Sequence, residues 1–328
     1  MNSAKRFDMV RTVFSVLIAL AISFVIIFLV SDQPLEAIKY LLIGPFTNKR
    51  SMGNVVESMI PLIFTGTGVC IMFSANQINL AGEGAFHIGG LIASCVAIKL
   101  TATFVSPFMA LLCAGLVGAL FTAIPAIMKI TTTASEMVSS LMINYLALYF
   151  GNYMLNNVIG DPKASAASYK LADAAELPVL IQGTRVHLGF IIAIAVAVLG
   201  YFFLYRTKTG YELRLAGENE EFARYSGISI VKVIMISQLL GGFVAGLGGG
   251  VEMLSPIYAR FTWTSLLGYG WDAIIICTLS KKEPIVYTFC SFVPCLSAYR
   301  SFYHGTKNRR YTGDRSDHTG YHYPACSC

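Results

Sequence analysis

Long apolar stretches without a single charged residue dominate this chain. Six of them are near the roughly 20 residues that an α-helix needs to cross about 30 Å of hydrocarbon. They cover residues 12–30, 59–75, 104–128, 138–159, 188–205 and 233–251. A chain that carries so many such runs is predicted to fold within a lipid bilayer rather than in water.

The composition agrees with a membrane location. Apolar residues make up 55% of the chain and charged residues only 13%, with a mean hydropathy of +0.63. A water-soluble domain of this length cannot bury so much apolar surface. Two further runs, residues 79–98 and 263–279, carry Glu83 and Asp272 and bring the expected total to about eight spans. Because lipid does not tolerate open strand edges, we expect an all-α polytopic membrane protein.

The distribution of basic residues predicts how the chain is oriented. The run at 12–30 follows Lys5, Arg6 and Arg11. It is long for a signal peptide and has no small-residue cleavage site, so it is interpreted as an uncleaved first span with a cytoplasmic N-terminus. If eight spans are counted from there, three basic segments lie on the cytoplasmic side: Lys129, residues 206–232, and Lys281 with Lys282. This agrees with the positive-inside rule. Lys49 and Arg50 fall outside and disagree with the rule.

From about Ile285 the character of the chain changes. Residues 301–328 are polar and aromatic and show no periodicity. The histidines and cysteines gathered there do not have the spacing of a zinc site, so no metal is expected: His318, His322, Cys326 and Cys328.

A frameshift explains this tail. Back-translation of residues 312–326 with the frame moved by one nucleotide permits an apolar helix, Pro-Glu-Ile-Val-Ala-Ile-Ile-Gln-Ala-Ile-Ile-Ile-Leu-Leu-Val. The same shift over residues 295–300 permits Ala-Tyr-Leu-Arg-Thr-Gly. We therefore expect a transmembrane domain at residues 1–284 and an aberrant, out-of-frame tail at 285–328, with the native C-terminal spans lost.

A charged segment at residues 210–232 interrupts the apolar pattern. Its order of residues at 213–217, 219 and 223–228 resembles the coupling loop of ABC-importer permeases of the ribose, branched-chain amino acid and nucleoside group. The resemblance implies a short helix that sits in a cleft of an ATPase subunit, within a cytoplasmic loop at 206–232. The residues implied in coupling are Arg214, Gly217, Asn219, Ala223, Arg224, Tyr225 and Gly227. Gly227 is expected to end the helix. The alternative is a solvated basic connector.

Three motifs place polar residues inside apolar runs. Residues 76–84 resemble the family's Asn-Ile-Gly-x-Glu-Gly motif, residues 135–145 its Leu-Met-x-Asn-Tyr pattern, and residues 268–272 its Gly-Tyr-Gly-Phe-Asp stretch. A broken helix at membrane depth is tolerated where it lines a cavity or is buried in protein. The substrate pathway is therefore expected to include Asn79, Glu83, Asn144, Tyr269 and Asp272.

Each of these residues also has a plain structural alternative. Residues 76–84 can be a purely structural break, and Asn144 can form an interhelical hydrogen bond. Glu136 is interpreted first as a cap at a helix start. Tyr269 and Trp271 can be membrane-interface anchors as well as stacking platforms. Glu252 has no assignable partner.

The remaining patterns exclude catalysis by this chain. The spacing Gly242-xxx-Gly246-xxx-Gly250 predicts close packing of helices, most simply within one chain. The sequence contains no GxxxxGK[ST] stretch, so ATP would be bound by a separate subunit. No set of acid, base and nucleophile residues clusters, and neither an enzyme activity nor a bound cofactor is expected. The loop at 160–187, predicted outside, is interpreted as a connector, an interfacial helix or a docking surface.

The resemblance implies a permease subunit of an ATP-driven importer in a bacterial plasma membrane, working by alternating access. Its implied partners are an ABC ATPase, a second identical or related permease and an extracytoplasmic substrate-binding lipoprotein, and no nucleic acid. The motifs favour a nucleoside of the guanosine type as substrate. Sugar or branched-chain amino acid transport remains open, as does a truncated product without function.

Overall fold

The computed structural model describes residues 48–100, 105–132, 134–164, 166–258, 260–292 and 294–295, with a few isolated positions nearer the N-terminus. The predicted first span at 12–30 and the tail at 301–328 lie outside this part, apart from those isolated positions. Within the described residues the regular structure is helical, and the only β pairing is two isolated bridges. The expected all-α fold is confirmed for this part of the chain.

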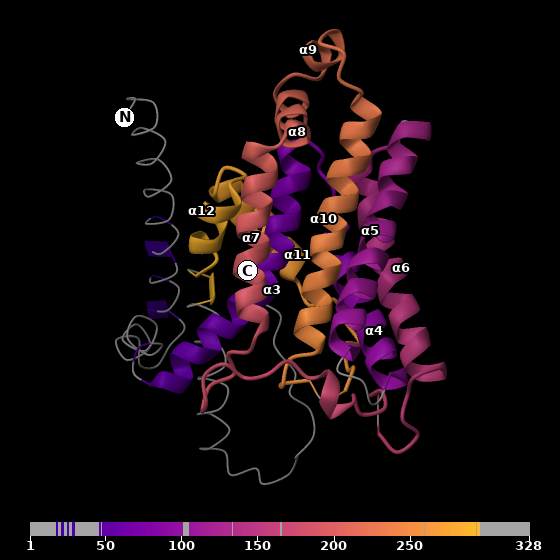
Figure 1. Cartoon of the computed structure of the whole chain (residues 1–328), viewed down its shortest axis with the longest axis vertical. Helices are drawn as coiled ribbons and strands as arrows, with labels where there is room; N and C mark the ends of the chain where they lie inside the picture. The colour runs from indigo at the N-terminus through magenta and orange to yellow at the C-terminus, as the bar shows by residue number, and fades with distance from the viewer. Residues whose placement is uncertain are drawn as a thin grey trace.

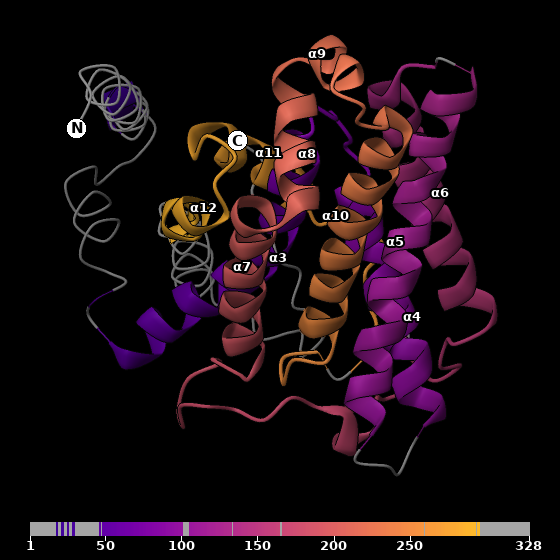
Figure 2. The ribbon, with the colours of Figure 1, turned by 45° about the horizontal axis from the view of Figure 1, so that its top comes forward.

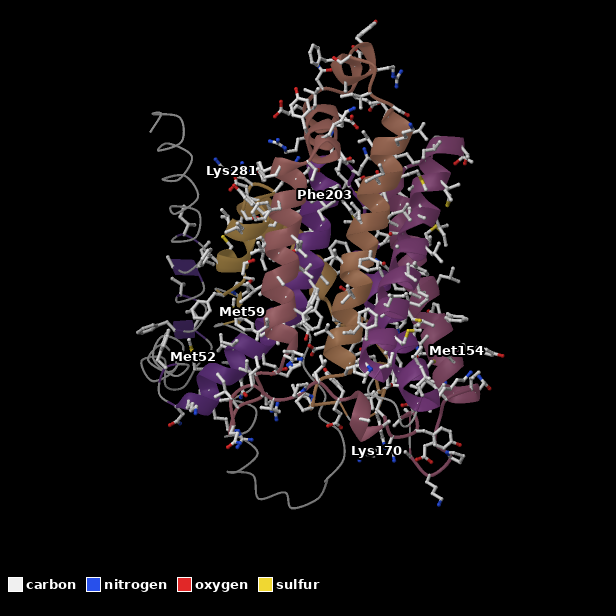
Figure 3. All side chains as sticks on the ribbon, viewed as in Figure 1. Met52, Met59, Met154, Lys170, Phe203 and Lys281 are labelled. Atoms are coloured by element: carbon white, nitrogen blue, oxygen red, sulfur yellow. The ribbon has the colours of Figure 1, made fainter. Side chains whose placement is uncertain are left out.

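The long helices lie side by side, and the short α8 and α9 project from one end of the bundle (Figure 1). In chain order the elements are α3 (Lys49–Ser74), α4 (Gly82–Lys99), α5 (Ser106–Thr132), α6 (Glu136–Asn157), η1 (Asp173–Ala175), α7 (Gly189–Arg206), α8 (Lys208–Glu218), α9 (Glu220–Tyr225), α10 (Ile230–Met253), α11 (Tyr269–Leu279) and α12 (Pro284–Cys290). We refer to the end that carries α9 as the α9 end. Phe203 and Lys281 lie toward it, whereas Lys170 lies at the opposite end (Figure 3).

Among the described residues, four helices are long and apolar enough to cross a membrane: α3, α5, α7 and α10. The predicted run at 263–279 is helical only from Tyr269, and its 11 residues extend about 16 Å, roughly half of the hydrocarbon thickness. The segment before it is irregular because Gly268 adopts a left-handed conformation with φ of 87°. The predicted number of eight spans therefore remains a prediction.

The centre of the bundle is α10, which packs against α5, α4 and α3 (Figure 2). A Cβ at Gly246 would lie 2.5 Å from the carbonyl oxygen of Ala114 and 2.9 Å from the Cα of Gly118, both in α5. Gly242 and Gly250 extend the same contact one turn in each direction. Backbones this close gain dispersion contacts that larger side chains would prevent. The glycine pattern thus packs helices within one chain, as predicted.

The loop between α6 and α7 folds against the chain that leads into α11. Asp161 accepts a hydrogen bond from Arg260 at 2.7 Å, and the backbone N–H of Ser168 donates to the carbonyl of Phe261. The Arg260 guanidinium and the backbone N–H of Lys163 lower the pKa of Asp161. Among the described residues of this loop the 3-10 turn η1 is the only helical element, so the alternative of an interfacial helix at 160–187 is not what the structure shows.

His187 at the end of this loop predicts a dependence of stability on pH. Its side chain is fully buried, neither ring nitrogen has a hydrogen-bond partner among the described residues, and burial lowers its pKa to about 4. The unfolded chain binds a proton at this ring near pH 6.5 while the folded chain does not, so stability falls as the pH drops from about 6.5 toward 4. By linkage this loss is about 2 kcal/mol at pH 5.

The variant His187→Gln is expected to remove this part of the acid sensitivity. Thermal unfolding of the detergent-solubilised protein between pH 7.5 and 4.5 measures it. The difference in stability between the original protein and the variant should shrink as the pH falls. A stability difference that stays constant across this pH range would show that His187 has the same charge in the folded and the unfolded protein.

Candidate functional site

The predicted helix break between α3 and α4 is present. Residues 75–81 are not helical, and Asn76 has a left-handed backbone with φ of 55°. Backbone groups in the break lack helical partners, and side chains of α6 bond to them instead. The N–H of Leu80 donates to Ser140 Oγ at 3.0 Å, and Asn144 Nδ2 donates to the carbonyl of Leu80 at 2.9 Å. Asn144 Oδ1 also accepts from the N–H of Gly84. Both ends of the Asn144 amide therefore hold the break in place.

A row of hydrogen-bonded polar side chains crosses the bundle beside this break. Asn79 Nδ2 donates to Gln238 Oε1 of α10 at 2.6 Å, and Gln238 Nε2 donates to Glu136 Oε1 of α6. Lys129 at the end of α5 donates to Glu136 Oε2 at 2.8 Å and to Gln77 Oε1. We call these five residues the polar network. Buried polar groups must be paired to avoid the cost of desolvation, and here the partners come from the break, α5, α6 and α10.

Glu83 lies at the starts of two helices. It belongs to the first turn of α4, its side chain is 2% exposed, and Oε1 accepts the N–H of Gly268 at 2.6 Å. Oε2 accepts the N–H of Gly270 in the first turn of α11. Helix N-termini carry partial positive charge and unpaired N–H groups, so a carboxylate between two of them is strongly stabilised. Glu83 thereby fixes the start of α11.

The other predicted pathway residues of α11 lie around this contact. The ring of Tyr269 meets the edge of Phe86 with centroids 5.3 Å apart, and Asp272 is half-buried in the first turn. Trp271 is 49% exposed and does not join that cluster. The structure thus brings Glu83, Tyr269 and Asp272 together at the start of α11, while Asn79 and Asn144 lie at the break. Their role in a substrate pathway stays a prediction.

An aromatic cluster covers the same region and was not predicted from the sequence. Trp263 stacks on Phe86 with centroids 5.6 Å apart, and Tyr258 and Phe261 contact the same indole. Trp263 is 4% exposed, and the N–H of its ring has no hydrogen-bond partner. The available signal was the presence of large aromatic residues shortly before the Gly-Tyr-Gly stretch.

The predicted coupling residues divide into those that face the bundle and those that face away. Arg214 lies over the ring of Tyr205 at 4.5 Å and donates from Nε to the carbonyl of Leu204, which joins α8 to the end of α7. A Cβ at Gly217 would lie 2.0 Å from the carbonyl oxygen of Ser74, so α8 packs directly on the end of α3. Ala223 is fully buried in a small apolar cluster beneath α9.

The helix α9 is capped at both ends, and most of its side chains are exposed, including those of Glu220 and Glu221. Asn219 accepts from the N–H of Phe222 at 3.0 Å as N-cap. Gly227, with φ of 82°, ends the helix in a Schellman arrangement, as predicted. Phe222, Arg224 and Tyr225 are 56%, 71% and 91% exposed, respectively. We call these three side chains the α9 surface.

Several residues of the site were missed in the sequence. Gln238 is a single amide in an apolar run. It is fully buried, and it is central to the polar network because it bonds to both Asn79 and Glu136. Lys129 was taken only as a sign of orientation, and Ser140 was not considered. Glu252, which was noted in the sequence without a partner, is 1% exposed; among the described residues its Oε2 has no hydrogen-bond partner, and Glu57 of α3 is a nearby charged group. Isolated polar residues in apolar runs were the common signal.

These features define a class of protein, a helical membrane protein with broken helices and an exposed, capped helix at one end of the bundle. The family model described as "Branched-chain amino acid transport system / permease component" matches residues 51–298. The chain therefore belongs to this family of ABC transporter permeases, whose members are membrane subunits rather than enzymes.

Characterised relatives support this assignment. The chain is 30% identical to the guanosine ABC transporter permease protein NupP of Bacillus subtilis, over 74% of this chain and 71% of the relative. It is also 30% identical to the glucose ABC transporter permease protein TsgB13 of Haloferax volcanii, over 84% and 76%. For the nucleoside ABC transporter permease protein NupB of Lactococcus lactis the identity is 24%, over 80% and 75%. No solved structure gives a significant match.

Proposed function

We propose that this chain is a permease subunit of an ATP-driven importer for nucleosides. The observation that carries the proposal is the α9 surface, a small exposed patch on a helix that packs against α8 and α10, while α8 in turn packs against α3 and α7. A connector without a partner would not need two helix caps and a buried alanine to present an aromatic and a basic side chain. The resemblance to guanosine and nucleoside permeases supports the choice of substrate.

Transport by alternating access would use the broken helices. An ATPase that closes on ATP displaces α9, and α8 passes the movement to α3 through the contact at Gly217. The break at 75–81 and the short α11 lie beyond that contact and are held by hydrogen bonds rather than by continuous helix. Asn79, Glu83, Asn144, Tyr269 and Asp272 would line the route of the substrate between these segments. ATP would be bound by the ATPase subunit, and this chain needs no cofactor of its own.

The proposed partners are the ATPase, a second permease and an extracytoplasmic substrate-binding lipoprotein. Two guanosine permease proteins of one organism, NupP and NupQ of Bacillus subtilis, both resemble this chain at 30% identity. This supports a pair of related permeases over a pair of identical ones. The proposed location is a bacterial plasma membrane with the N-terminus and the α9 end in the cytoplasm, where basic residues gather.

Uptake of labelled guanosine tests the proposal. The chain is expressed from a frame-restored gene with its ATPase, second permease and binding protein, and uptake is compared for guanosine, glucose and leucine. Guanosine should enter and the others should not. Arg224→Glu and Tyr225→Ala should each reduce uptake at least tenfold with unchanged membrane levels, whereas Lys208→Gln on exposed α8 should not. Undiminished uptake in both α9 variants, or entry of glucose alone, would contradict the proposal.

We also propose that the chain after Pro284 is out of frame. The support is that the family match ends at residue 298 and leaves the last 30 residues unmatched, although the match and the helix α12 both extend beyond Pro284. Resequencing codons 280 to 295 decides the matter, because a slip must be found there. If it is found, guanosine uptake is expected only from the frame-restored gene. An intact frame would refute this part without affecting the family assignment.

A further inference from the structure

Two cysteine sulfurs meet between α3 and α11. The Sγ atoms of Cys70 and Cys277 are 3.2 Å apart, although the residues are separated by 207 positions in the sequence. Both side chains are fully buried, and both cysteines are free. A disulfide has its sulfurs about 2.0 Å apart, so they need to approach by only about 1.2 Å.

The position of this pair within the bundle is also distinctive. Cys70 lies one turn before Ser74, the residue on which α8 packs through Gly217. Cys277 lies in the last turn of α11, close to Ser280, which ends the helix. Both sulfurs therefore lie near the α9 end of the bundle. The other described cysteines in long helices, Cys95 and Cys113, lie on α4 and α5 and have no such neighbour in the described structure.

We propose that Cys70 and Cys277 form an oxidisable dithiol whose disulfide joins α3 to α11. In the reaction each thiol loses its S–H bond and one S–S bond forms, releasing two protons and two electrons. A lipophilic two-electron oxidant of the azodicarboxamide class accepts both pairs and is reduced to the hydrazine. A dithiol reductant reverses the reaction by thiol–disulfide exchange. This site is independent of the proposed transport function.

The disulfide would hold α11 at both ends. At its start, Glu83 of α4 already binds the N–H groups of Gly268 and Gly270. At its other end the new bond would tie it covalently to α3. An element of 11 residues fixed at two points to two long helices can no longer move separately from them. The oxidised protein should therefore open α11 less often than the reduced protein.

Burial determines which oxidants reach the pair. Neither sulfur is exposed to solvent, and the surrounding side chains belong to the main apolar core. A small uncharged oxidant can dissolve in the bilayer and enter between helices. A charged oxidant such as tetrathionate cannot, so it should react only with exposed thiols. The contrast between the two reagents tests the assigned position of the pair.

Oxidation of the full-length chain in lipid nanodiscs gives the first measurement. After diamide treatment, remaining thiols are blocked with N-ethylmaleimide and the protein is digested for mass spectrometry. A linked pair of peptides that contain Cys70 and Cys277 should account for most molecules, and dithiothreitol should reverse it. The link should be absent in Cys70→Ser and in Cys277→Ser, and retained in Cys95→Ser and Cys113→Ser. Failure to form it with diamide, or equal formation with tetrathionate, would overturn the proposal.

Hydrogen exchange of the same samples gives the second measurement and does not depend on transport. Amides of α11 should exchange at least tenfold more slowly after oxidation and return to the original rate after reduction. Amides of α5 should not change. Equal exchange of α11 in the oxidised and reduced protein, with the link present, would show that the bond does not restrain the helix and would overturn the second part of the proposal.

Discussion

Replacing Glu83 with glutamine is expected to destabilise the protein by about 3 to 5 kcal/mol. A hydrogen bond to a charged group contributes about 1.5 to 3 kcal/mol, and Glu83 accepts two from the start of α11. A glutamine side chain has one oxygen in place of two, so its amide NH₂ group would face the N–H of Gly268 or of Gly270. It also lacks the negative charge that two helix N-termini favour. Thermal unfolding in detergent and the yield of inserted protein measure the effect.

Two control variants separate this role from a general effect of charge. Glu176→Gln, in the loop between α6 and α7, removes a carboxylate far from any helix start of the site and should change stability by less than about 0.5 kcal/mol. Glu83→Asp keeps the charge but has a shorter side chain, so it should lose one of the two hydrogen bonds. Its stability should lie between that of the original protein and that of Glu83→Gln. If Glu83→Gln unfolds at the same temperature as the original protein, Glu83 does not anchor α11.

The second large effect is expected from Glu136→Ala. This change leaves Gln238 Nε2 without its acceptor and Lys129 with Gln77 as its remaining partner in the polar network. Unpaired buried groups cost about 1 to 3 kcal/mol each, and the lysine is 32% exposed and so recovers some hydration. We expect a loss of about 2 to 4 kcal/mol. Chemical denaturation of the solubilised protein measures it.

A double-mutant cycle tests whether the network acts as a unit. The pair Lys129→Met and Glu136→Gln replaces the ion pair by neutral groups, and the new glutamine can still accept from Gln238. The double variant should be less destabilised than the sum of the two single variants by at least about 0.5 kcal/mol. Additive effects would mean that Lys129 and Glu136 do not interact energetically, despite their distance of 2.8 Å.

Much of the fold could be predicted because long uncharged apolar runs indicate helices. The runs at 138–159 and 188–205 differ from α6 and α7 by only one or two residues at each end. The interruption after residue 75 was visible as amides and glycines within an apolar stretch. The shortness of α11 was not visible, because the residues at 263–268 carry no charge and continue the apolar run. Only the left-handed backbone at Gly268 and the contacts of Trp263 separate them from the helix.

The site could be predicted as a set of residues but not as a set of contacts. Glu83 was found because a charge in an apolar run needs a partner, yet its partners are backbone N–H groups 185 and 187 residues away. Periodicity carries no information over such distances. In the same way, the caps of α9 follow from local sequence, whereas the inward positions of Gly217 and Ala223 depend on how α8 meets α3. Local signals predict elements, and tertiary packing assigns roles.

The contact between Gly217 and Ser74 makes α8 and α3 a single stiff arm. Because no side chain separates the two backbones, α8 cannot slide along α3 without a steric clash, and any substitution at Gly217 would change the angle between them. If this arm tilts, Ala75 and the following residues up to Leu80 must move with it. The N–H and C=O of Leu80 are hydrogen-bonded to side chains of α6. Two hydrogen bonds of α6 therefore add to the resistance that packing of α3 gives to such tilting, and Ser140→Ala removes one of them without changing either helix of the arm.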